Sequence, residues 1–235
     1  MPDPQREPSP ACPAEIAVNG QRLLAEPEGA LHWPRERTLV VADLHLEKGS
    51  AFATHGRMLP PYDTAQTLMR LQAVLDRLRP DRVICLGDSF HDRRAAERLS
   101  REDGAHLRRL IQDRDWLWVA GNHDPAPPVG WGGQVVAEAV IGTLVFRHQA
   151  RPGAAAEVSG HYHPMAVVHV RGRRIAARCF VGDGRRLILP AFGSYTGGLN
   201  VLDREIASLF HGHATAHVLS RSRVHALPTS RLSGR

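Results

Sequence analysis

The chain has 235 residues, a formal net charge of +6 and an isoelectric point of about 10.0. This length predicts one large domain that can bury a sizeable core. No apolar run is long enough to span a membrane, and the polar, proline-rich start is unlike a signal peptide. The three cysteines, Cys12, Cys85 and Cys179, are too few and too scattered for a disulfide framework, which favours a reducing cytoplasm.

The basic character of the chain is compatible with a polyanionic partner such as nucleic acid. Lys48 is the one lysine, and every other Lys/Arg position is an arginine. That skew, beside abundant alanine and glycine, is also typical of a GC-rich genome. Charge alone therefore leaves the nucleic-acid interpretation open.

Three regions are expected along the chain. Residues 1–13 are predicted to be a disordered leader, and residues 14–220 a single domain. Residues 221–235 hold arginines and no acid, so we expect a frayed, solvated tail, the alternative being an arm that binds nucleic acid.

The first half of the domain alternates strand and helix patterns. Asn19-Gly20 predicts a tight hairpin turn between strands at 15–18 and 22–25, and 30–33 is a further short strand. Apolar runs that end on polar residues predict buried strands at 38–43, 82–88 and 116–120. Helices are expected over 63–79 and 93–112, and 46–61 is a long loop suited to the rim of an active site. Successive strand–helix units predict an α/β sheet.

The second half has a different pattern, with short strands and few helical periods. Strands are predicted at 134–140, 143–147, 157–159, 165–170, 174–181 and 186–189, with a helical turn over 206–210. This region is expected to form a second sheet that is antiparallel in part.

Metal-binding residue types stand where the predicted strands end. Asp43 and His45 follow the first buried strand, and if the backbone stays extended both side chains project to the same side. On its own this pair is as well explained by a polar strand end. The series continues, however, with further residues of the same kind after later strands: Asp88, Asn122, His123, Asp124, His148, His161 and His163. Together they predict a metal centre.

The residue types indicate which metals and which chemistry to expect. Oxygen and nitrogen ligands without cysteine suit Mn²⁺, Fe or Zn²⁺. The candidate ligands exceed the needs of one ion. Two ions that share a bridging carboxylate are the arrangement used for in-line displacement at phosphorus. Asp88, from the middle strand, is the expected bridge.

The motifs D-x-H at 43–45, G-D at 87–88, G-N-H-D at 121–124, His148 and G-H-x-H at 160–163 resemble the calcineurin-like metallophosphoesterases. The resemblance implies an α/β fold, a four-layer αββα sandwich of two mixed sheets with a binuclear metal site at the carboxyl ends of the strands. It also implies ligand sets. One metal would be bound by Asp43, His45, Asp88 and His163, and the other by Asp88, Asn122, His148 and His161.

The resemblance also implies roles in catalysis. His123 would act as general acid at the leaving oxygen, oriented by Asp124. His91 stands where the family commonly has a second acid. It either contacts the substrate or supports the metal ligands from behind, and both interpretations remain open.

Longer motifs at 43–49, 86–92 and 190–200 resemble the bacterial ligase-associated DNA damage response endonucleases. That branch is encoded beside a DNA ligase, an exonuclease and a helicase. It implies a manganese-dependent phosphodiesterase acting on DNA in repair. Candidate substrate contacts are Lys48, His55 and Arg57 in the long loop, which can neutralise backbone phosphates, and Tyr195 in the last motif.

Two other functions compete with this one. A phosphatase or cyclic-nucleotide phosphodiesterase acting on small substrates would use the same metal chemistry. A scaffold protein would keep the fold without catalysis. Its usual mark is the loss of metal ligands, and none of the expected ligands is missing here.

Overall fold

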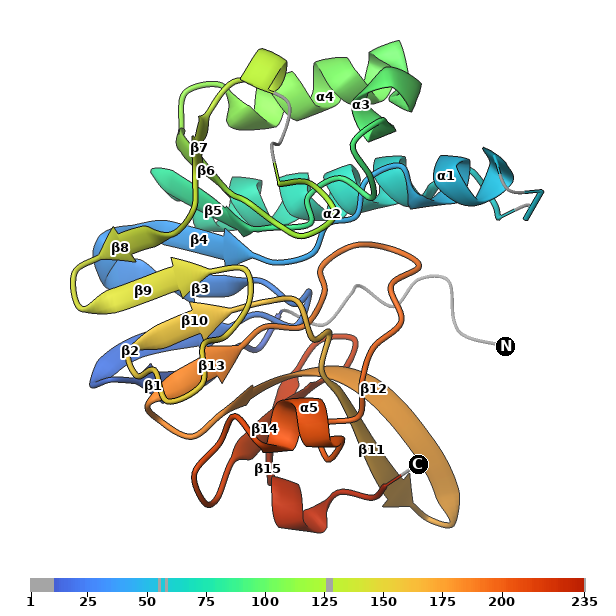
Figure 1. Ribbon diagram of the computed structural model, residues 1–235. Helices are drawn as coiled ribbons and strands as arrows, with labels where there is room; N and C mark the ends of the chain where they lie inside the picture. The colour runs from blue at the N-terminus through green and yellow to red at the C-terminus, as the bar shows by residue number, and fades with distance from the viewer. Residues whose placement is uncertain (1–10, 55, 58, 126–128, 235) are drawn as a thin grey trace.

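The computed structural model describes residues 11–54, 56–57, 59–125 and 129–234. Two β-sheets pack face to face, and helices cover their outer faces (Figure 1). No helix in these ranges is both long and apolar enough to cross a membrane. The predicted leader, apart from residues 11–13, and His55 lie outside the described residues.

The first sheet has its strands in chain order, antiparallel from β1 to β4 and parallel from β4 to β7. Its strands are β1 (Ala14–Val18), β2 (Gln21–Ala25), β3 (Leu31–Trp33), β4 (Thr38–Val41), β5 (Arg82–Leu86), β6 (Asp115–Val119) and β7 (Gln134–Val136). The predicted hairpin is confirmed, because Asn19 and Gly20 both have positive φ angles, 47° and 77°.

The second sheet has the order β15-β14-β12-β13-β10-β9-β8, and β11 pairs with β12 beside it. Its strands are β8 (Ala139–Ile141), β9 (Leu144–Arg147), β10 (Glu157–Ser159), β11 (Met165–Val170), β12 (Arg173–Gly182), β13 (Arg186–Ile188), β14 (Thr215–Leu219) and β15 (Val224–Pro228). Strands β9, β10 and β13 are parallel, and the other pairs are antiparallel. Two mixed sheets are therefore present, as predicted.

Helices complete the four layers. The outer face of the first sheet carries α1 (Lys48–Thr54), α2 (Asp63–Leu78), α3 (Ala95–Arg98) and α4 (Arg101–Ile111) (Figure 1). The outer face of the second sheet carries α5 (Arg204–Ala207). Single 3-10 turns lie at Pro34–Glu36, Val129–Trp131 and Thr229–Arg231. The fourth layer is thus the thinnest.

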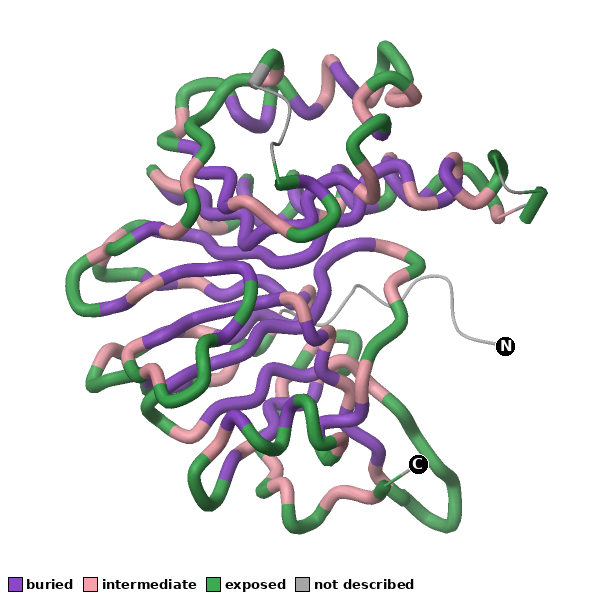
Figure 2. Tube along the Cα trace, in the orientation of Figure 1, coloured by how far each residue is buried: buried purple, intermediate pink, exposed green. Residues whose placement is uncertain are grey.

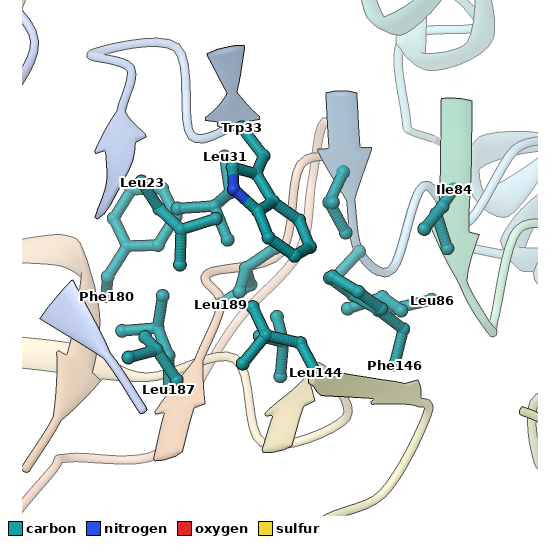
Figure 3. Close-up of a cluster of buried hydrophobic side chains, with 14 of the residues drawn as sticks. Leu23, Leu31, Trp33, Ile84, Leu86, Leu144, Phe146, Phe180, Leu187 and Leu189 are labelled. Carbon is teal, nitrogen blue, oxygen red and sulfur yellow. The ribbon is translucent and has the colours of Figure 1, made fainter. Parts of the chain in front are cut away.

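The sheets are held together by an apolar core between them. Trp33, Phe146 and Phe180 are at most 1% exposed there, among leucines from both sheets (Figure 3). A second core joins the first sheet to α2 and α4. Figure 2 shows the facing strands as almost continuously buried. Rigid packing on both faces of β4, β5 and β6 fixes where these strands end.

Four predicted elements differ from the structure. Part of the loop at 46–61 is the helix α1. The helix at 93–112 is divided into α3 and α4, because Ser100 caps a new helix by accepting a hydrogen bond from Asp103 N at 3.0 Å. The strand at 134–140 is two strands, since the chain passes from the edge of one sheet, β7, to the edge of the other, β8.

The predicted disordered tail is the fourth difference. Residues 224–228 form β15, which pairs along its whole length with β14. The absence of acids indicated a solvated tail, but backbone pairing with a sheet edge does not depend on side-chain charge. The leader boundary also shifts, because the backbone of Cys12 forms a parallel β-bridge with Arg223, the residue before β15.

Candidate metal centre

The carboxyl ends of strands from both sheets meet at one place. Asp43 follows β4 and Asp88 follows β5, while His148 directly follows β9 in the facing sheet. Because β4 and β5 are parallel, their ends lie at the same edge. His161 follows β10, which is parallel to β9. The structure therefore brings together residues that are more than one hundred positions apart.

The first group of candidate ligands is Asp43, His45 and His163. The Nε2 atom of His163 lies 3.3 Å from Oδ1 of Asp43 and 3.3 Å from Nε2 of His45. Asp43 is fully buried and His45 is 4% exposed. These atoms are close enough to surround one cation.

The second group is Asp88, His148 and His161, with Asn122 beside it. Nε2 of His148 lies 3.4 Å from Oδ2 of Asp88, 3.0 Å from Nδ1 of His161 and 2.8 Å from Oδ1 of Asn122. Oδ2 of Asp88 is also 4.0 Å from Nε2 of His45 in the first group. Asp88 therefore lies between the two groups, as expected of a bridging carboxylate.

Backbone carbonyls determine which ring nitrogens carry protons. Nδ1 of His148 donates to Leu86 O at 2.9 Å, and Nδ1 of His163 donates to Gly197 O at 3.1 Å. In each neutral ring Nε2 then carries no proton and presents its lone pair. It faces carboxylate oxygens and other ring nitrogens, and the buried Oδ1 of Asp43 meets Nε2 of His163 at 3.3 Å. Either a proton or a metal cation must lie between such atoms, so the residues fit a metal centre.

The pKa shifts agree with this interpretation. Burial raises the pKa of Asp43, but its contact with His163 and the nearby His148 outweigh burial and leave it below the ordinary value. Burial lowers the pKa of His45 to about 3. Burial also lowers the pKa of His163, but the hydrogen bond with Asp43 outweighs it and the pKa is raised. A metal cation bound by Asp43 and His163 would displace the proton of the hydrogen bond between them.

The backbone at these ligands is not extended, which corrects the geometry predicted for Asp43 and His45. Both have left-handed φ angles, 54° and 43°. The strand ends at Val41, and both candidate ligands lie beyond its regular pairing. The same conformation recurs in three further candidate ligands, namely Asp88 (46°), His161 (73°) and His163 (47°). Such conformations cost roughly 1–3 kcal/mol each and are often clustered at functional sites.

His123 lies at the exposed edge of the centre. Its backbone N donates to Oδ1 of Asp88 at 2.9 Å, which places it beside the proposed bridge. Nδ1 meets the carbonyl oxygen of His91 at 3.0 Å. That oxygen only accepts, so Nδ1 carries a proton and Nε2 is the atom that can gain or lose one. This is the geometry expected of a general acid.

Asp124 does not contact His123 side chain to side chain, which contradicts the predicted orienting role. Its Oδ2 accepts from Ser89 N at 2.9 Å and from Phe90 N at 3.0 Å. Burial raises the pKa of Asp124 to about 7 against these amide hydrogen bonds. The carbonyl of His91 orients His123 instead, and Asp124 fixes the loop that follows Asp88.

The predicted substrate contacts fall on two sides of the centre. On one side, His91, His123 and Arg57 line a cavity of about 550 Å³ together with Phe52. Nζ of Lys48 lies 5.9 Å from the ring centre of Phe52. On the other side, Tyr195 lines a separate hollow of about 240 Å³. The sequence does not single out Phe52, because its pattern over 46–61 predicts a loop where the structure has helix α1.

His91 belongs to the wall of the larger cavity. Its ring stacks on that of His123, with 5.6 Å between centres, and lies 6.0 Å from the ring of Phe52. Burial, with Lys48 and His123 nearby, lowers the pKa of His91. It is therefore next to the space for a substrate, and its side-chain Nδ1 is buried without a hydrogen-bond partner among the described residues.

Comparison with known proteins identifies the family. The sequence pattern of the calcineurin-like phosphoesterases matches residues 36–155, about half of the chain. The chain belongs to this family. It is 30% identical to the Pseudomonas putida nuclease MPE, with a TM-score of 0.70 over 92% of this chain and 100% of that one. The predicted family and its fold are confirmed, and the nuclease agrees with the branch that the motifs resemble.

Two further comparisons add little to this. The E. coli phosphoesterase Yfce is 10% identical, with a TM-score of 0.42 over 81% of this chain and 97% of that chain, and we draw no argument from it. No curated protein matches the chain. As a calcineurin-like phosphoesterase, the protein is a hydrolase of phosphoesters with candidate sites for divalent metals.

Proposed function

We propose that this phosphoesterase is a two-metal phosphodiesterase that cleaves DNA internally, as an endonuclease of DNA repair. The observation that carries the proposal is the position of Asp88 between two Asp/His groups, with His123 hydrogen-bonded beside it. We assign Asp43, His45, Asp88 and His163 to one metal. The other is assigned to Asp88, Asn122, His148 and His161.

The residues then have separate tasks. Divalent metals bound at the two groups would activate water and neutralise phosphoryl oxygens. Buried carboxylates and oriented imidazoles hold these groups rigid, so little reorganisation is needed during the reaction. His123 supplies a proton to the leaving oxygen from Nε2, while its Nδ1 stays bonded to the carbonyl of His91. Mn²⁺ suits the mixed oxygen and nitrogen ligands, and Fe or Zn²⁺ are alternatives.

DNA as substrate has three supports: the similarity to a nuclease, the net charge of +6, and the basic side chains Lys48 and Arg57 beside the centre. The proposal also includes a cytoplasmic location, consistent with free Cys12, Cys85 and Cys179. Action beside a DNA ligase, an exonuclease and a helicase rests on the motif resemblance alone.

A small ester is the second candidate substrate. The cavity beside His123 measures about 550 Å³, a size typical of sites for small ligands. His91→Asn separates the two interpretations of His91, which either contacts the substrate or supports its neighbours. If His91 contacts the substrate, the ratio of diester to monoester hydrolysis changes several-fold. An unchanged ratio assigns His91 to support of its neighbours.

The deciding experiment is a cleavage assay of single-stranded, duplex, flap and hairpin DNA with Mn²⁺, Mg²⁺, Zn²⁺ or Fe²⁺, alongside bis(p-nitrophenyl) phosphate. We expect metal-dependent nicking of at least one DNA. Hydrolysis of the small diester without nicking of any DNA would replace the proposal with the small-ester function. No hydrolysis of any substrate would contradict both.

A further inference from the structure

Two arginines from distant parts of the chain line the smaller hollow. Arg70 comes from α2 and Arg178 from β12, and the loop carrying Ser194, Tyr195 and Thr196 closes the space, which measures about 240 Å³. Neither arginine forms an ion pair within the described part of the chain. A pair of cations without a carboxylate is unusual at a partly buried position.

Most of their hydrogen-bonding capacity is unused. Nη2 of Arg70 donates to the carbonyl oxygen of Phe192, and its guanidinium lies 4.7 Å from the Phe192 ring centre. Nη1 of Arg178 donates to Ala191 O at 2.9 Å. Nε of Arg70 is buried without a partner. Each guanidinium has five N–H donors, so a suitable acceptor would find several of them available.

Among the described residues, the surrounding charges compensate the pair only through Glu28, which acts on Arg70 without an ion pair and shares Arg77 with Glu26. Burial, and after it the charge of Arg178, lowers the pKa of Arg70 to about 10, so Arg70 stays charged at neutral pH. The acid that acts on Arg70 electrostatically is Glu28. Its Oε1 accepts from Arg77 at 2.9 Å. Planar guanidinium groups bind phosphate oxygens in a bidentate manner, which makes a phosphate the matching ligand.

The hollow is connected to the metal centre through one loop. Gly193 N donates to Asp43 O at 3.1 Å, and Gly197 O accepts from Nδ1 of His163. Between these two contacts the loop passes Ser194, Tyr195 and Thr196, which line the hollow. The loop that lines the hollow therefore also contacts Asp43 and the ring of His163 in the first group of candidate ligands.

We propose that Arg70 and Arg178 form a subsite for a second backbone phosphate of the DNA strand, beside the one that is cleaved. This inference rests on the proposed function. Such a subsite would give a DNA strand a contact that a small ester with one phosphate lacks. Tyr195, 38% exposed at the edge of the hollow, completes the contact.

Gln66→Glu tests the subsite without removing either arginine. Gln66 lines the hollow from an exposed position on α2, one turn before Arg70, so the new carboxylate competes with the phosphate for the guanidinium groups. Gln72→Glu, exposed on the same helix, makes an equal charge change away from the hollow and serves as control. Glutamate and glutamine have similar helix propensities, so both variants should fold.

The measurement is the affinity of a labelled single-stranded oligonucleotide for the metal-loaded chain at several salt concentrations. For Gln66→Glu we expect roughly ten-fold weaker binding, since charged hydrogen bonds are lost. The slope of log K against log salt is negative, and its magnitude should decrease by about 0.7, the value for one phosphate on a single strand. The loss in kcat/KM should be larger for DNA than for bis(p-nitrophenyl) phosphate. Gln72→Glu should bind and cleave like the wild type.

The possible results separate the subsite from the proposed function. A wild type that neither binds nor cleaves DNA would overturn both. Normal DNA cleavage by the wild type with equal effects of Gln66→Glu and Gln72→Glu would overturn the subsite alone. The last measurement is the thermal unfolding of the wild type and of Gln66→Glu in the presence of inorganic phosphate. If free phosphate stabilises the wild type as strongly as the oligonucleotide, and Gln66→Glu abolishes this, the hollow binds free phosphate and not the DNA backbone.

Discussion

Asp88 and His123 lie within hydrogen-bonding distance of each other and yet have different proposed tasks. The carboxylate of Asp88 faces ring nitrogens of both groups, whereas Nε2 of His123 is available for proton transfer. Deleting the Asp88 side chain should release the metals from the centre, and deleting the His123 side chain should leave them bound. The two side chains thus provide a direct test of the assignment.

We therefore predict that Asp88→Ala abolishes hydrolysis and loses bound metal. His123→Ala should retain metal and lose about 10²–10⁴ in turnover, the usual contribution of a general acid. Metal content per chain and kcat, measured on the same preparations, check this. Equal metal loss in both variants would show that their tasks are not separate.

Gly121 is a second residue on which the centre depends, although it ligates nothing. A Cβ atom at this position would lie 2.2 Å from Oδ1 of Asp88 and 2.6 Å from Oδ1 of Asp124. Backbone and buried carboxylates cannot move away easily in such a packed region. Gly121→Ala must therefore displace the proposed bridge.

The expected result for Gly121→Ala is roughly a ten- to hundred-fold loss of activity with reduced metal affinity, since supporting positions commonly cost 10–100-fold in metal affinity or activity. Gly130→Ala is the matched control, because a Cβ atom there meets nothing within 4 Å. Metal titration and steady-state kinetics measure both variants. Normal metal binding by Gly121→Ala would contradict the rigidity assumed for the centre.

At the scale of elements, α4 depends on a single cap. Ser100 accepts from Asp103 N, and the helix then packs against α2 on the outer face of the first sheet. Sequence periodicity did not reveal this start, because residues 93–112 are charged and helical on both sides of Ser100. The cap, rather than the pattern, divides the two helices.

Ser100→Ala should lower the free energy of unfolding by about 1 kcal/mol, a typical cost of losing an N-cap. Ser100→Asp should stay close to the wild type, since aspartate caps as well as serine does. Urea unfolding followed by circular dichroism measures the difference. If both variants lose the same stability, the cap has no role in holding α4.

The elements also show what sequence reasoning can and cannot predict. Buried strands such as β4, β5 and β6 were predictable because apolar runs of that length have few alternatives. Helix α1 was not, because its seven residues are too short for a periodic pattern, and its link to α2 through Gly49 and Asp63 is tertiary. For the same reason Arg70 and Arg178 carried no local signal.

For the whole molecule, metal binding is expected to govern stability. The ligands come from both sheets, so the two halves of the domain share the centre. Metals that bind the folded chain alone stabilise it by about 2.7 kcal/mol per site at one hundred times Kd. In a domain of this size 1 kcal/mol corresponds to about 2–4 °C in Tm.

We predict that Mn²⁺ raises the Tm of the metal-free chain by about 5–11 °C per site under these conditions. Thermal unfolding with and without Mn²⁺, and with a chelator, tests this. His163→Ala should reduce the shift by removing a ligand of one group. A Tm that does not respond to any divalent metal would argue against a functional centre.

The sequence pointed to the residues that the structure gathers as candidate ligands, whereas it did not indicate their backbone conformation. Apolar runs ending on Asp43 and Asp88 pointed to a shared edge, and the structure places both there. An extended backbone was the condition under which Asp43 and His45 would project to the same side. The left-handed conformations are imposed by the surrounding packing, and a local sequence pattern holds no information about that packing.

At the candidate ligands with left-handed φ angles, the residue that suits the backbone best is not the residue that can bind a metal. Glycine adopts positive φ without steric cost, so replacing Asp43, His45 or His161 by glycine would relax the backbone while deleting a ligand. A population of this gene evolving without need for hydrolysis would be expected to lose its metal ligands first at these positions. Retention of these side chains in a relative would accordingly point to use of the centre, although Asp43 also supports the fold by accepting from His161 N at 2.9 Å.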